Sequence, residues 1–132
     1  MSANYHAWQI DPTDFDEHAS LRDQLLFLVG FAVLAPSSHN SQPWRFFVHE
    51  HTITIAPESK RVLPVSDPRN RNLYIALGCA AENIVVAASY YGFSVRIDHT
   101  QVDGMFALKL ELEKTAKTAP SREHLIFAIP KR

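Results

Sequence analysis

The sequence has few cysteines, little net charge and no long apolar run. Its only cysteine is Cys79, so an internal disulfide framework is excluded and a reducing compartment fits best. The formal net charge is −1, so no overall basic field favours nucleic acid as a partner. The apolar run at residues 25–35 is too short to span a bilayer, so we expect no membrane partner either.

Lysine and arginine are also missing from the first 20 positions, which carry acidic residues instead. Since secretory signals begin with a basic region, we expect a cytoplasmic protein. The 132 residues, 46% apolar and 20% charged, suffice for one soluble domain with a real core. We divide the chain into an N-terminal arm, residues 1–16, and one globular unit, residues 17–132. The aromatic residues Tyr5, Trp8 and Phe15 favour docking of the arm over a disordered terminus.

Two long helices are expected. The first covers residues 17–35, where apolar residues recur at the helical spacing, although Ser20 could cap a slightly later start. Its second half has no polar face and should therefore be buried on all sides. The second helix begins at Asp67-Pro68, with the aspartate as its cap, and ends at Gly92. Small residues are frequent in it, which fits a central buried helix that can also form a subunit interface.

Four segments alternate between apolar and polar residues as β-strands do. They are residues 44–49, 52–56, 93–99 and 105–113. The first two form a hairpin, although Glu50-His51 makes a poor tight turn and leaves its register open. An irregular loop, residues 57–70, precedes the second helix, and Ser121 can cap a short helix that reaches Ile129. The chain is therefore predicted to be an α+β protein with antiparallel strands packed on a central helix.

The most informative stretch, residues 35–46, lies between the first helix and the first strand. It reads Ala-Pro-Ser-Ser-His-Asn-Ser-Gln-Pro-Trp-Arg-Phe. Prolines restrict the backbone, while serine and asparagine bend it and offer donors and acceptors. We therefore expect a rigid polar loop on a packed scaffold, which is a common place for a binding site. The alternative is a helix-ending loop made of ordinary turn residues.

This stretch resembles the signature loop of the nitroreductase-like flavoproteins, on the pattern Ala-Pro-Ser-Ser-x-Asn-Ser-Gln-Pro-Trp-x-Phe. A second match starts with Asp67-Pro68-x-x-Arg71 and continues through Ala76-Leu77-Gly78-x-Ala80-Ala81-x-Asn83 to Ala87-Ala88 and Gly92. The resemblance covers residues 20–98 and is closer to the branch with two fused halves. It implies a nitroreductase-like α/β sandwich that binds FMN, takes electrons from NADH or NADPH and passes them to a quinone or nitroaromatic acceptor.

The resemblance also implies which residues face the flavin. They are Pro36, Ser37, Ser38, Asn40 and Gln42. The two amides offer paired donors and acceptors that match the imide and carbonyls of the pyrimidine edge, and Trp44 can wall the pocket. We assign no catalytic acid or base, since N5 of the flavin can itself accept the hydride, and we expect no metal.

A phosphate contact is less clearly indicated. Arg71 lies at the start of the second helix, where an anion would use the free backbone amides, and it is the candidate phosphate ligand. The alternative is that Arg69 and Arg71 are solvated or pair with Asp67. The Arg-x-Ser-x-Arg-type clamp that family members usually carry near the N-terminus is missing, since Arg22 is the only lysine or arginine before residue 36.

The sequence ends about where the second half of such a protein would begin. We therefore expect the first half of a nitroreductase-like protein, which forms a homodimer or pairs with a second half. The alternative is a non-catalytic half-domain that stores flavin or only pairs with a partner chain.

Other residues have plainer interpretations. His39 follows a serine, but no third group would orient a hydrolase pair. His49-x-His51 lacks a third metal ligand. Cys79 is expected to act as a small apolar residue rather than as a reactive thiol. Asn83 is either a satisfied interior amide or a contact to the flavin or a partner.

Overall fold

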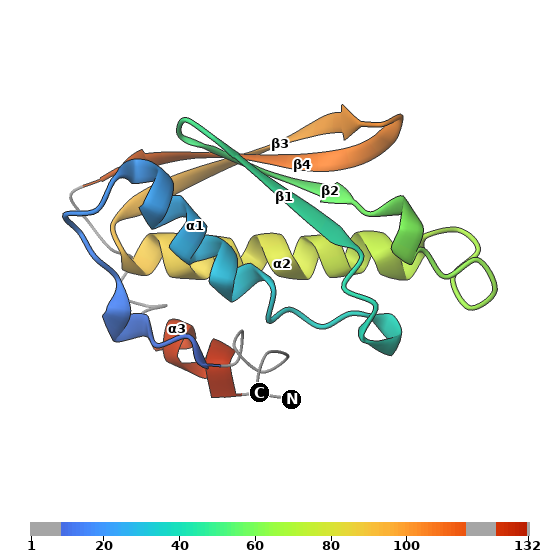
Figure 1. Ribbon diagram of the computed structural model, residues 1–132, viewed down its shortest axis with the longest axis horizontal. Coiled ribbons are helices and arrows are strands. Elements are labelled where there is room, and N and C mark those ends of the chain that lie inside the picture. Colours follow the sequence, from blue (N-terminus) through green and yellow to red (C-terminus); the bar gives the residue numbers. More distant parts are fainter. Residues whose placement is uncertain (1–8, 116–123, 132) are drawn as a thin grey trace.

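The computed structural model describes residues 9–115 and 124–131 of the chain. Three α-helices and four β-strands lie in these residues (Figure 1). The helices are α1 (Leu21–Ala32), α2 (Arg71–Tyr90) and α3 (Leu125–Ala128). The strands are β1 (Trp44–His49), β2 (Thr52–Pro57), β3 (Phe93–Val102) and β4 (Met105–Lys114). The predicted α+β class is confirmed.

The four strands form one antiparallel sheet in the order β1-β2-β4-β3. Two hairpins build it, and β2 joins them by pairing with β4. In the first hairpin Phe46 lies opposite Ile55 and Val48 opposite Ile53, so these apolar residues share one face. The connection Glu50-His51 does close a tight turn, because Glu50 adopts the left-handed conformation at φ 51°.

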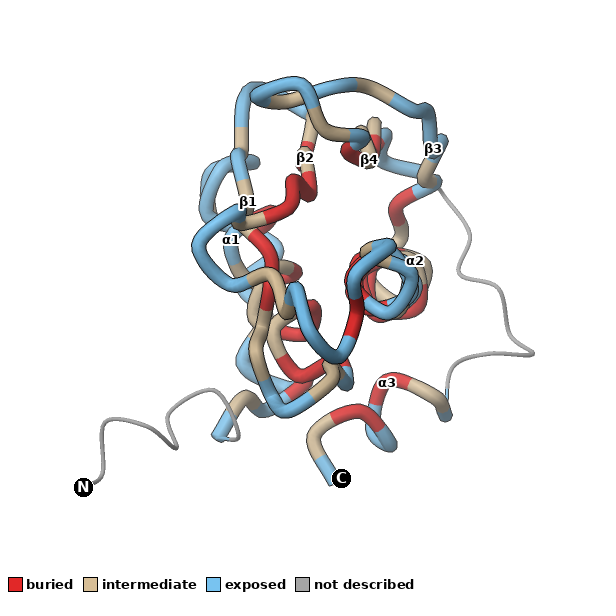
Figure 2. The backbone as a smooth tube through the Cα atoms, turned by 90° about the vertical axis from the view of Figure 1, so that its right-hand side faces the viewer, coloured by how far each residue is buried: buried red, intermediate tan, exposed pale blue. Residues whose placement is uncertain are grey.

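Helix α2 lies against one face of the sheet and forms the centre of the core (Figures 1 and 2). Ten of its 20 residues are buried, as the prediction of a central buried helix requires. Leu77 and Ile84 of this helix belong to one fully buried cluster with Ile53, Ile55 and Leu110 of the sheet. Burial of such aliphatic side chains, at about 1.5–3 kcal/mol each, is the main stabilising contribution to the fold.

Helix α2 is also the one described helix that is long and apolar enough, by length and composition, to cross a bilayer. Within the fold, 56% of its most apolar stretch is buried. A helix that packs between a sheet and neighbouring helices has the same apolar composition as a spanning helix. The core role of α2 therefore accounts for its hydropathy.

Part of the predicted arm packs against the core. The rings of Phe15 and Tyr91 stack with their centroids 4.0 Å apart, and the Tyr91 hydroxyl donates a hydrogen bond to the carbonyl of Pro12. Ile10 packs against the core beside Gly30. Phe15 thus docks as expected, whereas Tyr5 and Trp8 lie outside the described residues. The division of the chain at residue 16 stays a prediction.

The first helix is shorter than predicted and less completely buried. It begins at Leu21, where the Ser20 hydroxyl accepts a hydrogen bond from the amide of Asp23 at 3.1 Å, so the expected cap is confirmed. Its second half is not buried on all sides, because the side chain of Leu26 is 44% exposed. The prediction failed because an apolar run does not reveal which of its sides the fold leaves uncovered.

The second helix begins later than predicted. Asn70 adopts the left-handed conformation at φ 56°, so regular helix starts only at Arg71 rather than at Asp67-Pro68. The carboxylate of Asp67 nevertheless caps the helix, since it accepts a hydrogen bond from the amide of Leu73 at 2.9 Å. The aspartate was correctly identified as a cap, but an additional turn separates it from the helix.

Two further boundaries differ. Strand β3 extends to Val102 because Asp103-Gly104 alone makes the turn, with both residues at positive φ. The C-terminal helix α3 begins at Leu125, and its expected cap Ser121 lies outside the described residues.

Candidate functional site

The candidate site is the loop between α1 and β1, which the fold places beside the N-terminal end of α2 (Figure 1). It contains one turn of 3-10 helix, Ser38–Asn40. Three of its residues other than glycine have left-handed backbones: His39 at φ 55°, Asn40 at φ 50° and Gln42 at φ 47°. Such conformations are unfavourable for residues with a Cβ and cluster at functional sites.

Hydrogen bonds within the loop hold this backbone. The Ser37 hydroxyl accepts from the amide of Gln42 at 3.0 Å, and the Ser37 carbonyl accepts from the amide of Asn40 at 3.0 Å. The Ser38 carbonyl accepts from the amide of Ser41 at 3.0 Å. The serines therefore shape the loop, and the rigid polar loop predicted from the sequence is present.

Residues 58–61, which follow β2, also hydrogen-bond to the end of the loop. Arg61 donates from Nη1 to the carbonyl of Gln42 at 3.1 Å, and the amide of Glu58 donates to the carbonyl of Pro43 at 2.9 Å. At its end the loop enters the core through Trp44, which is 7% exposed and packs beside Phe46. The tryptophan therefore anchors the loop in the core.

The two amide side chains remain accessible on this ordered backbone. Asn40 is exposed and Gln42 is half-buried. Within the described part of the chain, their side-chain amides bond only to one another, from Gln42 Nε2 to Asn40 Oδ1 at 3.4 Å. This is a long hydrogen bond that a ligand could replace. Of the other predicted flavin-facing residues, Pro36 is exposed and Ser37 and Ser38 are half-buried in the same loop.

The start of α2 borders the loop. Ser38 and Ser41 share a narrow recess with Asn72 and Leu73, closed on other sides by Arg61 and Asp67. Its volume is about 10 Å³, so it can hold about one water molecule and no ring system. A planar ligand would therefore have to lie on the outer surface of the loop.

The arginines at this helix end are exposed. Asp67 bonds to the Leu73 amide, and neither Arg69 nor Arg71 forms an ion pair within the described ranges. Arg71 is not among the residues that line the recess. The suggested pairing with Asp67 is thus absent, and Arg71 as a phosphate ligand stays a prediction. Arg22 also has a structural partner, because it donates from Nη1 to the carbonyl of Val48 at 2.9 Å.

The interior role of Asn83 is confirmed, and the places of the histidines and of Cys79 in the fold follow. Asn83 is buried and donates from Nδ2 to the carbonyl of Phe31 at 2.9 Å, so it is the satisfied interior amide. His49 and His51 are exposed at the first hairpin's tip. No group of three potential metal ligands occurs in residues 9–115 or 124–131. Cys79 is half-buried on α2.

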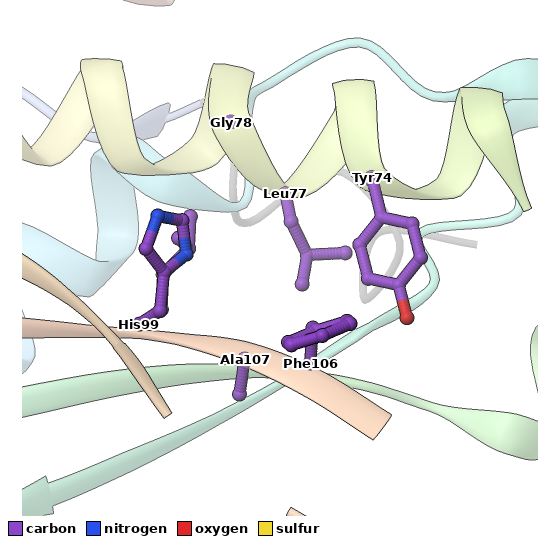
Figure 3. A pocket seen from close by; sticks show the side chains of 7 residues that line it. Tyr74, Leu77, Gly78, His99, Phe106 and Ala107 are labelled. Atoms are coloured by element: carbon purple, nitrogen blue, oxygen red, sulfur yellow. The ribbon is translucent and has the colours of Figure 1, made fainter. Parts of the chain in front are cut away.

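Sequence reasoning missed a larger cavity elsewhere. It lies between α2 and the β3–β4 hairpin and has a volume of about 520 Å³ (Figure 3). Tyr74, Phe106 and His99 contribute to its lining. No sequence signal pointed to it, because these residues are far apart in the chain and follow ordinary helix and strand patterns.

Comparison with curated proteins finds relatives over part of the chain. It is 32% identical over 76 residues to "Putative NAD(P)H nitroreductase acg" of Mycobacterium tuberculosis, a match that covers 58% of this chain and 23% of the relative. It is 29% identical over 87 residues to "Putative NAD(P)H nitroreductase Rv3131" of the same organism, covering 66% of this chain and 25% of the relative. The match thus spans about a quarter of the length of each relative. No protein-family model matches the chain.

The loop at residues 35–46 and the names of these two relatives indicate the same protein family. The resemblance of this chain to the nitroreductase-like family is confirmed over part of its length.

Proposed function

We propose that this chain belongs to an FMN-dependent NAD(P)H oxidoreductase of the nitroreductase type and supplies the edge contacts to the flavin. The observation that carries the proposal is the accessible amide pair, Asn40 and Gln42, on a loop whose backbone bonds to itself. The names of the relatives support the oxidoreductase class and a nicotinamide reductant. The α+β fold, with its sheet packed on α2, is compatible with a partial nitroreductase-like sandwich.

The donor set of the loop fits the pyrimidine edge of a flavin. That edge presents an imide N–H between two carbonyls, and each side-chain amide offers one acceptor and two donors. Because Asn40 and Gln42 stand on an already ordered backbone, binding would freeze few additional torsions. The hydroxyl of Ser37 already accepts a hydrogen bond from the backbone amide of Gln42, so Ser37 serves to shape the loop.

When bound, FMN would supply the hydride and electron chemistry that protein side chains lack. The chain's own task is to hold one edge of the ring, to orient it and to leave a ring face open to the nicotinamide and then to the acceptor. A quinone or a nitroaromatic is the proposed acceptor. No described side chain needs to act as an acid or base for these tasks.

A second protein segment would have to complete the site. The recess beside Ser38 is too small for the ring, so the ligand would rest on the outer surface of the loop and need covering from outside. The relatives are about four times as long as the matched stretch, which supports a contribution from further sequence. We therefore propose a homodimer or a pairing with a second half, in the cytoplasm, with Arg71 available to the FMN phosphate.

One observation favours the non-catalytic alternative, in which the chain stores flavin or only pairs with a partner. Arg22 is the only lysine or arginine before the loop in the sequence, and its side chain donates a hydrogen bond to the carbonyl of Val48. It therefore cannot replace the missing N-terminal clamp without giving up this bond. Turnover, rather than binding, separates the two functions.

The test begins with the visible spectrum of the purified protein, before and after addition of FMN. The proposal expects a flavin absorption that shifts on binding, and then oxidation of NADH or NADPH when a quinone is added. If the protein bound flavin but did not oxidise NADH or NADPH, the flavin-storage function would be favoured instead. A colourless protein that does not respond to FMN would refute flavin binding by this chain.

A further inference from the structure

The cavity between α2 and the β3–β4 hairpin shares no lining residue with the proposed flavin loop. Tyr74, Leu77 and Gly78 line it from the helix, and His99, Phe106 and Leu108 from the strands. In Figure 3 the Tyr74 and Leu77 side chains point from α2 toward the strands, and the His99 ring points from the strand toward the helix. Its volume of about 520 Å³ falls in the range of small-molecule sites.

The cavity exists because α2 covers only part of the sheet. Leu110 and Leu112 of β4 are fully buried, whereas Phe106 on the same strand face is 61% exposed. On the helix side, Gly78 has no side chain, and a Cβ built there would meet no atom within 4 Å. The missing side chain thus leaves this part of the cavity wall open.

The chemistry of the lining selects one class of ligand. Two aromatic rings and two leucines offer apolar contacts, and none of the residues that line the cavity carries a permanent charge. The lining offers phosphates and carboxylates no cationic partner, so an uncharged ligand gives up less hydration where it contacts the apolar side chains. Aromatic rings pack well against a flat ring system, either offset-stacked or edge to face.

The lining has two polar side-chain groups, the Tyr74 hydroxyl on the helix side and the imidazole of His99 on the strand side, and we assign the polar contact to His99. Its side chain has no hydrogen-bond or ion-pair partner within the described part of the chain, and its ring lies at the cavity. A neutral imidazole offers one donor and one acceptor, so it can bind a single hydroxyl or carbonyl. A binding group at one end of an apolar slot fixes the orientation of a ligand.

We propose that this cavity binds an uncharged two-ring aromatic molecule that carries one hydroxyl or carbonyl facing His99. This site goes beyond the proposed flavin function and does not depend on it. Binding is expected in protein free of FMN, and the ligand needs no redox activity. Failure of the flavin proposal would leave this site unaffected.

The probe is 2-naphthol, titrated into flavin-free protein and followed by its fluorescence and by backbone amide NMR shifts. The expected result is saturable binding, with shifts at residues 74–78 and 106–108. The charged analogue 2-naphthoate should bind at least tenfold more weakly, because its carboxylate has no cationic partner in the cavity. Binding of naphthoate equal to that of naphthol, or shifts confined to other residues, would overturn the proposal.

A Cβ at residue 78 would meet no atom within 4 Å, so we expect Gly78→Leu to fold and its longer side chain to fill part of the cavity. We expect at least a tenfold loss of naphthol affinity. Ala128→Leu adds the same side chain at an exposed position on α3, outside the lining, and should leave the affinity unchanged. Equal affinities of the two variants would refute this location of the site.

The variant His99→Leu tests the polar contact separately. It should remove the preference for 2-naphthol over naphthalene while naphthalene still binds. An unchanged preference would remove His99 from the site. Light scattering of wild type and Gly78→Leu supplies the last check: if wild type binds no naphthol and the substitution turns a dimer into a monomer, the surface is a protein interface and the proposal is wrong.

Discussion

The carboxylate of Asp67 accepts a hydrogen bond from the backbone amide of Leu73 at 2.9 Å, across the turn that precedes α2. Asp67 is only 7% exposed, so this bond is shielded from water. One buried carboxylate thus fixes both the end of the loop at residues 57–70 and the first turn of the central helix.

The variant Asp67→Ala should lower the free energy of unfolding by about 1–2 kcal/mol, because the Leu73 amide loses its acceptor. Urea denaturation followed by circular dichroism measures the change. Asp67→Asn keeps an acceptor oxygen and should lose less than the alanine variant. Equal stability of Asp67→Ala and wild type would show that the turn holds itself without this bond.

The same residue shows what sequence can and cannot predict. A cap followed by proline identified Asp67 correctly, since this chemistry depends on neighbouring residues. The left-handed turn at Asn70, which delays the helix, depends on how the loop packs and could not be predicted. For the same reason hydrophobic periodicity predicted all four strands but not the exposure of Leu26 or Phe106, which is set by what α2 and the sheet leave uncovered.

Some features of the candidate site could likewise be predicted from the sequence and others could not. The rigid loop was predictable, because its prolines and serines restrict the backbone locally. The left-handed residues His39, Asn40 and Gln42 were not, because none of them is glycine. The cavity beside Gly78 could not be predicted either, since it depends on the position of a helix over a sheet.

Asn83 links the two long helices, and its loss should affect stability rather than ligand binding. Asn83→Leu removes the donor to the buried carbonyl of Phe31, which should lower the free energy of unfolding by about 1–3 kcal/mol. Chemical denaturation measures this loss, and an FMN titration of the folded variant should give the wild-type affinity. A variant that kept its stability but lost flavin affinity would place Asn83 in the ligand site instead.

Two glycines should respond to alanine in opposite ways. Gly92 has φ 83°, and a Cβ there would lie 3.3 Å from the Thr115 carbonyl, so Gly92→Ala should destabilise the protein by about 1–2 kcal/mol. Gly78 lies within α2 with open space around it, so Gly78→Ala should stabilise by up to about 1 kcal/mol. Thermal midpoints measure both changes. A decrease for Gly78→Ala would contradict the open space that the proposed cavity requires.

The hydroxyl of Tyr91 should make the protein less stable in alkaline solution. Burial raises the pKa of its hydroxyl above the ordinary value of 10.0. Above about pH 10 the unfolded chain therefore releases this proton while the folded chain retains it, so the free energy of unfolding falls as the pH rises. Denaturation midpoints between pH 8 and 11 measure the effect. Tyr91→Phe should be less stable at neutral pH, by about 1 kcal/mol, because the bond to Pro12 is lost, but its stability should fall less steeply above pH 10.

Asn40 allows the sharpest test of the flavin loop, because its side chain and its backbone can be varied separately. Asn40→Ala removes the amide and also places alanine at φ 50°, whereas Asn40→Gly removes the amide and relieves the backbone. If the amide binds the flavin edge, both variants should lose about 1–3 kcal/mol of FMN affinity, measured by quenching of flavin fluorescence. His39→Gly, at φ 55° in the same turn, is the matched control and should keep the affinity. Loss of affinity in Asn40→Ala alone would assign the effect to the backbone and remove the amide from the site.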